Sequence, residues 1–188
     1  RYGEMLYGIA QYLNKRRVMA WICTHWLSWI YGEQGVGDLC QFRAKEGIRL
    51  YREAGDSKGV CFSMVYLSRA LRKSGHIVKA RKKAEEMLQF AREIDYKDGI
   101  AVAHDQLGKA ARDLGEWKEA EKHFELARDW CERDESNLDV TMLMNIRGNL
   151  GWVSFNLGNY ERGKDLCEES LAFFDRIGGK GYSTVLRC

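Results

Sequence analysis

Hydrophobic residues recur every three or four positions along most of the chain, and glycine separates the stretches that carry this pattern. Near the middle of the chain, apolar or small side chains follow this spacing at Leu107 and Ala111, and again at Trp117, Ala120 and Phe124. Such spacing lies on one face of an α-helix, whereas a strand would alternate with a period of two. The 188 residues include 19 glycines and no proline, which is typical of helices joined by tight turns that end on glycine. The pattern predicts an all-α protein.

The helical pattern is repeated along the chain. The stretch LGEWKEAEKHF (114–124) returns in altered form as LGNYERGKDLC (157–167), 43 positions later. Placing Cys61 under Ala101, and Trp21 under Cys61, aligns further stretches without a gap at an offset of 40. A period of about 20 to 50 residues is the signature of stacked helical or strand repeats. We predict one solenoid fragment over residues 1–188, which comprises the tail of a preceding repeat (1–20), four repeats (21–60, 61–100, 101–143 and 144–183) and the start of a following helix (184–188).

Two positions of every repeat carry small residues. Small side chains allow two helices to approach closely, so we assign these positions to the core and expect no chemistry from them. They are Ser28, Ser68, Gly108 and Gly151 at position 8, and Cys40, Ala80, Ala120 and Gly163 at position 20.

The third repeat resembles a known family. Its residues Leu107-Gly108, Leu114-Gly115, Trp117, Ala120, Phe124 and Ala127 are similar to the tetratricopeptide pattern, W-x2-L-G-x2-Y followed by A-x3-F and a proline. The resemblance covers residues 21–183 and departs from the pattern in three ways. The terminal proline is missing, position 4 lacks tryptophan, and the period is 40 or 43 instead of about 34. The resemblance implies a right-handed α-solenoid of antiparallel helix pairs.

The long period points to a subfamily. Similar long repeats occur in kinesin light chains, Pins-type polarity adaptors and the sensor arms of bacterial signal-transduction NTPases. The segment Arg147–Phe174 is most similar to the repeats that follow the nucleotide-binding module of STAND/NB-ARC-type NTPases. This resemblance implies a ligand- or partner-sensing arm of a larger signalling protein.

In the tetratricopeptide scheme, positions 2, 5, 9, 12 and 13 of each repeat line a concave groove. In the first repeat these are Ile22, His25, Trp29, Gly32 and Glu33, and the two middle repeats place five cations there against two acids. Arginine pairs with carboxylates and tryptophan anchors apolar side chains at interfaces. We therefore predict a protein or peptide partner, acidic in character, that binds Trp29, Arg69, Arg72, Lys73, Lys109, Arg112 and Trp152. The alternative is that the cations only keep the surface solvated while the tryptophans pack between repeats.

Charge and composition bear on the partner. Thirty Lys and Arg oppose 27 Asp and Glu, a formal net charge of +3, which is small for a nucleic-acid-binding protein. A single-stranded nucleic-acid-binding repeat module is nevertheless the alternative function, because helical-pair repeats can read one base per unit. No stretch of 18 apolar residues is found, so no membrane partner is expected. We also expect self-association through apolar surfaces at the ends of the repeat array.

No catalytic pattern emerges from the sequence. GGKGYST (178–184) does not match G-x-x-x-x-G-K-[ST], and His76, His104 and His123 lack the spacing of metal ligands. The six cysteines include no C-x-x-C pair, which indicates reduced thiols rather than a zinc or disulfide framework. We predict a cytoplasmic, non-enzymatic scaffold with no cofactor and no metal.

Overall fold

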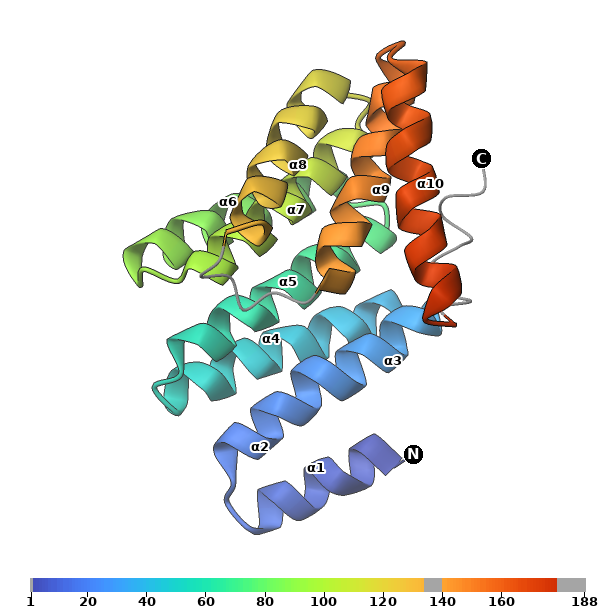
Figure 1. The fold of residues 1–188 in the computed structure, drawn as a ribbon. Coiled ribbons are helices and arrows are strands. Elements are labelled where there is room, and N and C mark those ends of the chain that lie inside the picture. The colour runs from blue at the N-terminus through green and yellow to red at the C-terminus, as the bar shows by residue number, and fades with distance from the viewer. Residues whose placement is uncertain (1, 134–139, 179–188) are drawn as a thin grey trace. The chain divides into compact units, whose positions relative to one another are not determined.

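The computed structural model describes residues 2–133 and 140–178, and every regular element in these ranges is helical (Figure 1). The all-α prediction is therefore confirmed. The elements are α1 (Tyr2–Tyr12), α2 (Arg16–Trp21), the π-helical segment η1 (Ile22–Leu27), α3 (Ser28–Glu33), α4 (Gly37–Glu53), α5 (Ser57–Lys73), α6 (Ile77–Glu93), α7 (Lys97–Asp113), α8 (Trp117–Cys131), α9 (Val140–Asn156) and α10 (Tyr160–Arg176). The residues around 135–139 and the expected helix start at 184–188 lie outside the described ranges.

Tight turns of one kind join the two helices of each pair. Helices α4, α6, α8 and α10 begin 40, 40 and 43 residues apart. In the turn before α8, Gly115 has φ +76 and its N–H donates to Arg112 O at 3.0 Å, while Glu116 N–H donates to Ala111 O at 2.9 Å. These bonds satisfy the last carbonyls of α7, and the positive φ favours glycine. The same left-handed conformation is taken by Gly35, Gly75 and Gly158 in the equivalent turns.

The chain divides between Gln106 and Leu107, within α7, into two compact units. In the first unit, α4 packs against α5 around buried residues such as Leu50 and Val60. A buried hydroxyl pair, Thr24 Oγ1 and Ser63 Oγ at 2.7 Å, crosses this core. A Cβ added to Gly47 would lie 2.3 Å from Thr24 Oγ1, so the small residue at 47 permits the close approach of the helices.

The second unit has its own core. Phe124, Ile146 and Leu150 are fully buried there between α8 and α9. Helices α9 and α10 approach closely at two glycines, since a Cβ on Gly151 would lie 2.9 Å from the carbonyl oxygen of Gly163. The small residues at positions 8 and 20 of this repeat thus mark a close helix contact.

The helix formed by α2, η1 and α3 contains one residue more than its counterparts. Its three consecutive segments have six residues each, 18 in all, whereas α5, α7 and α9 have 17. The additional residue is accommodated in η1, where the N–H of Ser28 donates to Cys23 O, five residues back. This i→i+5 bonding defines a π-helical turn.

The π turn corrects the register predicted for the first repeat. Ala20 (0% exposed) takes the core position that Cys61 (1%) has in the next repeat. Trp21 (48%) then corresponds to the exposed Phe62 (36%). Ile22, expected in the groove, is buried at 4%. The alignment at an offset of 40 is therefore wrong by one residue on the N-terminal side of η1, because a π turn contains more residues than an α turn.

Candidate functional site

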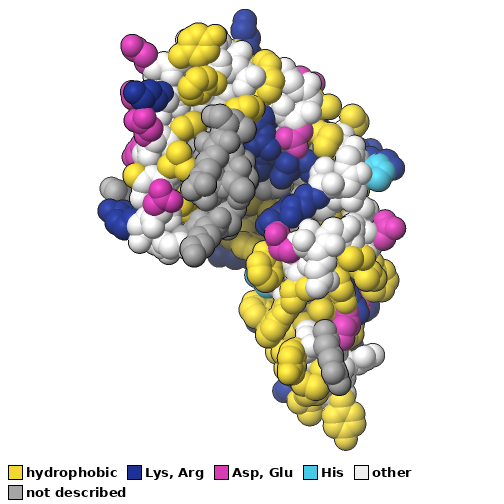
Figure 2. Space-filling model, turned by 90° about the vertical axis from the view of Figure 1, so that its right-hand side faces the viewer, with side chains coloured by type: hydrophobic (Ala, Val, Ile, Leu, Met, Phe, Trp, Pro, Cys, Tyr) yellow, Lys and Arg dark blue, Asp and Glu magenta, His cyan; other side chains and the backbone are white. Residues whose placement is uncertain are grey.

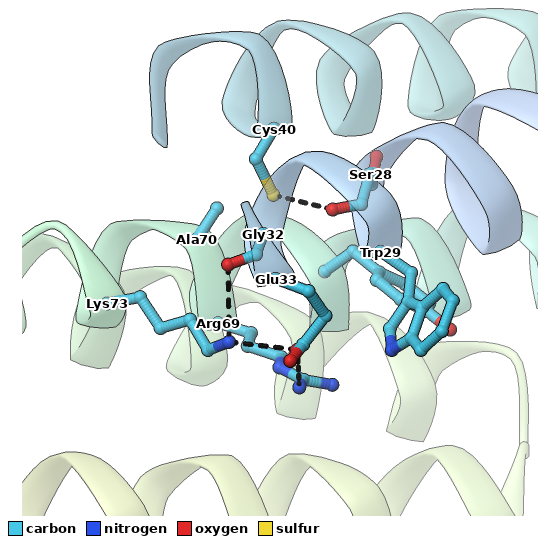
Figure 3. A pocket seen from close by; sticks show the side chains of 9 residues that line it. Ser28, Trp29, Gly32, Glu33, Cys40, Arg69, Ala70 and Lys73 are labelled. Atoms are coloured by element: carbon cyan, nitrogen blue, oxygen red, sulfur yellow. Dashed lines mark hydrogen bonds and ion pairs between the residues drawn. The ribbon is translucent and has the colours of Figure 1, made fainter. Parts of the chain in front are cut away.

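A hollow lies in the first unit between α3, α4 and α5 (Figure 3). It opens to solvent and encloses room for little more than one water molecule. We call it the basic hollow, and its lining residues are Ser28, Trp29, Gly32, Glu33, Cys40, Tyr66, Arg69, Ala70 and Lys73. Three of the residues predicted to bind a partner, Trp29, Arg69 and Lys73, are brought together here.

One carboxylate in the basic hollow is shared by two cations. Glu33 Oε1 accepts from Arg69 Nη2 at 3.0 Å and from Lys73 Nζ at 3.0 Å, and Lys73 Nζ also donates to Gly32 O at 3.3 Å. The hydrogen bond from Lys73 is the main reason why the pKa of Glu33 is lowered, and the charges of Lys73 and Arg69 add to it against partial desolvation. These three side chains together carry one excess positive charge and are each about 40 to 50% exposed.

The other residues that line the basic hollow carry no reactive group. Cys40 Sγ donates to Ser28 O at 3.0 Å, and burial raises the pKa of the Cys40 thiol, so this cysteine is not a reactive nucleophile. Ala70 is 2% exposed. The indole of Trp29 lies beside the Glu33 carboxylate, at the opposite end of the hollow from Lys73, and is half exposed (Figure 3). The hollow therefore offers cationic donors beside an aromatic surface.

An aromatic cluster on the same helices was not identified as a site from the sequence. It consists of Trp21, His25, Phe62 and Tyr66. The His25 ring stacks between Trp21 (centroids 5.4 Å apart, 14° between planes) and Phe62 (5.0 Å, 20°), and Tyr66 meets it edge-on at 5.8 Å. Burial lowers the pKa of His25, opposed by a backbone hydrogen bond to Trp21. The i, i+4 spacing of Trp21–His25 and of Phe62–Tyr66 is the sequence signal that could have indicated the cluster.

The other predicted residues lie elsewhere. Arg72 is partly buried on α5 and does not line the basic hollow. Lys109, Arg112 and Trp152 belong to the second unit, where Lys109 is partly buried and Trp152 is 37% exposed.

Arg112 is held within the second unit. Its Nη1 donates to Asn149 Oδ1, and its Nη2 donates to Asp113 Oδ1 at 2.9 Å. Asn149 Nδ2 in turn donates to Asn145 O at 2.8 Å. Arg112 therefore already has polar partners from α7 and α9, and a ligand would have to compete with them.

The described residues offer neither a metal site nor a membrane span. No cluster of three or more His, Cys, Asp or Glu side chains suited to a metal ion is found among the described residues. Within those residues, too, no helix is long and apolar enough to cross a membrane. Cys23 and Cys61 are buried free thiols whose pKa values burial raises to about 12, so neither is suited to nucleophilic chemistry.

The helical architecture is that of tetratricopeptide-type repeat proteins of known structure. The apo form of RapI is similar with a TM-score of 0.71 and 19% identity, over 89% of this chain and 60% of RapI. A Rap protein complexed with Competence and Sporulation Factor gives a TM-score of 0.78 and 18% identity, over 95% of this chain and 49% of that protein. The TPR-like repeats of a Podospora anserina putative kinesin light chain give 0.59 and 15%, over 87% and 75% of the respective chains.

These similarities define the fold class as a tetratricopeptide-type helical-repeat solenoid. No protein-family model and no curated protein matches the sequence. The chain spans 60% and 49% of the two Rap structures.

Proposed function

We propose that this chain is a non-catalytic protein- or peptide-binding scaffold whose basic hollow binds an acidic segment of the partner. The observation that carries the proposal is that Arg69 and Lys73 converge on one carboxylate, Glu33, beside the half-exposed Trp29. A carboxylate of the partner would find the same two donors and a net positive charge, while Trp29 would cover an apolar part of its side chain.

The structural neighbours support this kind of function. One of them is a Rap protein in complex with Competence and Sporulation Factor, so a protein of similar fold is known in complex with a binding partner. Lys109, Arg112 and Trp152 form a second candidate surface, on the second unit. Because Arg112 is already bonded to Asn149 and Asp113, we rank this surface below the basic hollow.

We also propose a wider role as the sensing arm of a larger cytoplasmic signalling protein. The support is the likeness of residues 147–174 to the repeats of STAND/NB-ARC-type NTPases, together with the buried free thiols Cys23 and Cys61. Domain mapping of the full-length protein tests this proposal, because it requires a nucleotide-binding module in the same polypeptide.

A binding titration tests the basic hollow. Fluorescence anisotropy would follow a labelled dodecapeptide of alternating Glu and Gly, with its Lys–Gly counterpart for comparison. We expect saturable binding of the acidic peptide only, weakened about fivefold or more by Arg69→Glu or Lys73→Glu, since each change replaces an attraction with a repulsion. Arg52→Glu is the matched control, because Arg52 is exposed on α4 away from the hollow.

The same titration addresses the nucleic-acid alternative. Single-stranded oligo(U) should bind weakly, because its affinity comes from a run of phosphate contacts, whereas the basic hollow offers only the two cations Arg69 and Lys73. Tight binding of oligo(U) with a steep dependence on salt concentration, together with no binding of the acidic peptide, would contradict the scaffold proposal.

A further inference from the structure

We propose that the aromatic cluster of Trp21, His25, Phe62 and Tyr66 is a subsite that binds an aromatic side chain of a neutral or acidic partner peptide. This inference rests on the proposed function and specifies the chemistry of the partner. Figure 2 shows that hydrophobic side chains gather over the N-terminal helices, and Trp21 and Phe62 are among the exposed ones.

The geometry of the cluster suits a flat ring. Three rings lie nearly parallel in the order Trp21, His25, Phe62, with planes 14° and 20° apart. Trp21 and Phe62 remain 48% and 36% exposed at the two ends of this stack. A further aromatic ring can stack on such a surface or meet its edge, and aromatic pairs add about 0.5 to 1.5 kcal/mol beyond the area they bury.

The π turn is what creates the cluster. Without the additional residue in η1, the core position equivalent to Cys61 would fall on Trp21 instead of Ala20. The extra residue rotates Trp21 out of the core to the position equivalent to Phe62. Single π turns within α-helices are frequent at functional sites, and here the turn exposes a large aromatic side chain that the helix could otherwise bury.

Charges next to the cluster select the occupant. Side chains one helical turn from a cluster ring are neighbours on the helix surface, and the charged ones at this spacing are Arg17, Lys58 and Arg69, all cations. Arg17 pairs with Asp56 at 3.3 Å, Lys58 lies over the Tyr96 ring, and Arg69 pairs with Glu33. Two of these cations are paired with acids, and Lys58 adds one excess positive charge beside the cluster. A neutral ring, or a ring flanked by acids, is therefore favoured over a cationic side chain.

The cluster is also continuous with the basic hollow. Tyr66 meets His25 edge-on at 5.8 Å and lines the hollow as well. On α5, Phe62, Tyr66, Arg69 and Lys73 follow at spacings of four, three and four residues, which places them along one face of the helix. One bound segment can therefore contact both sites.

Short peptides without an acidic residue separate this inference from the basic hollow. The probes are acetyl-Gly-Xaa-Gly-amide with Xaa as Trp, Leu or Arg, titrated against isotope-labelled protein while the Trp21 indole N–H and His25 ring signals are followed by NMR. We expect saturable shifts with the Trp peptide and weaker binding of the Leu and Arg peptides. Trp21→Ala and Phe62→Ala should each weaken binding of the Trp peptide about fivefold, and Trp21→Phe should retain it.

Phe42→Ala is the matched control, because Phe42 is a 57% exposed aromatic residue on α4, outside the cluster. Equal binding of the Trp and Leu peptides, or unchanged binding by Trp21→Ala, would overturn the inference. Oligo(U) that shifts the same signals more tightly than the Trp peptide would overturn it in favour of nucleic acid. In another outcome, Arg69→Glu abolishes binding of the acidic peptide while Trp21→Ala leaves binding of the Trp peptide unchanged. This result would support the proposed function and refute only the aromatic subsite.

Discussion

At the scale of single residues, Glu33 determines how much of the predicted basic character a partner can use. The sequence places Arg69 and Lys73 in the groove as cations available to a ligand, but in the structure both donate to the Glu33 carboxylate. A partner carboxylate must displace Glu33 or bind beside it. If an acidic peptide binds as proposed, the internal ion pair limits its affinity without any change in the backbone.

Replacing Glu33 by Gln should therefore strengthen binding of the Glu–Gly peptide by about two- to fivefold, the range expected for exposed ion pairs. The melting temperature should change little for the same reason. Fluorescence anisotropy at low salt measures the effect, and Glu53→Gln, on an exposed acid of α4, is the control. Unchanged or weaker binding by Glu33→Gln would contradict the competition.

His25 should make stability dependent on pH. Burial lowers its pKa below the ordinary value of 6.5, so the unfolded chain binds a proton that the folded chain resists. The free energy of unfolding should then be unaffected by His25 above about pH 6.5 and should decrease as the pH falls below that value. Thermal melts between pH 7.5 and 5.5 should show a smaller decrease for His25→Phe than for the wild type.

This pH window separates His25 from the nearby carboxylates. The pKa values of Glu4, Glu33 and Glu46 are lowered from 4.5, so their contribution to stability is present above that pH and is lost only in more acidic solution. Parallel pH curves for the wild type and His25→Phe would show that protonation of His25 is not the cause.

At the scale of helices, small residues decide how closely the pairs pack. Ala120 is fully buried on α8, in the core that also contains Phe124 and Leu150. The neighbouring Glu119 is 37% exposed and contacts Lys122 at 3.6 Å. Ala120 therefore faces the core, whereas its neighbour Glu119 is partly exposed to solvent.

Ala120→Arg should lower the free energy of unfolding by about 3 kcal/mol or more, because it forces a long cation into a packed core. Glu119→Arg, which loses the contacts of a partly exposed carboxylate with Lys122 and His123, should change stability by less than about 1 kcal/mol. Urea unfolding monitored by circular dichroism compares the two. Equal midpoints would contradict the packing of α8 described above.

At the scale of the whole molecule, the exposed apolar surface of α1 favours association. Tyr2, Met5, Ile9 and Tyr12 are between 49% and 90% exposed on this single helix. In solenoids, surfaces of this kind are normally covered by a neighbouring repeat. We therefore expect this polypeptide to self-associate through α1.

Light scattering over a range of protein concentrations should show a rise in average mass that Met5→Lys together with Ile9→Lys abolishes. The matched control is Val78→Lys with Leu126→Lys, which changes two exposed hydrophobic residues on other helices. A monodisperse monomer at high concentration would contradict self-association, and an equal effect of the control pair would show that α1 is not the surface involved.

The hydrophobic periodicity, the glycines between helices and the repeated small residues determined the helical class and close helix contacts, since these depend on local spacing. The one-residue register change in the first repeat could not be read in this way. An α turn and a π turn differ by one residue, and which one forms depends on whether Ala20 or Trp21 fits the core. Only the tertiary structure decided that Trp21 is exposed, that His25 lies between two rings, and that Glu33 forms ion pairs with Arg69 and Lys73. Each of these depends on contacts between helices that lie about 40 residues apart in the sequence.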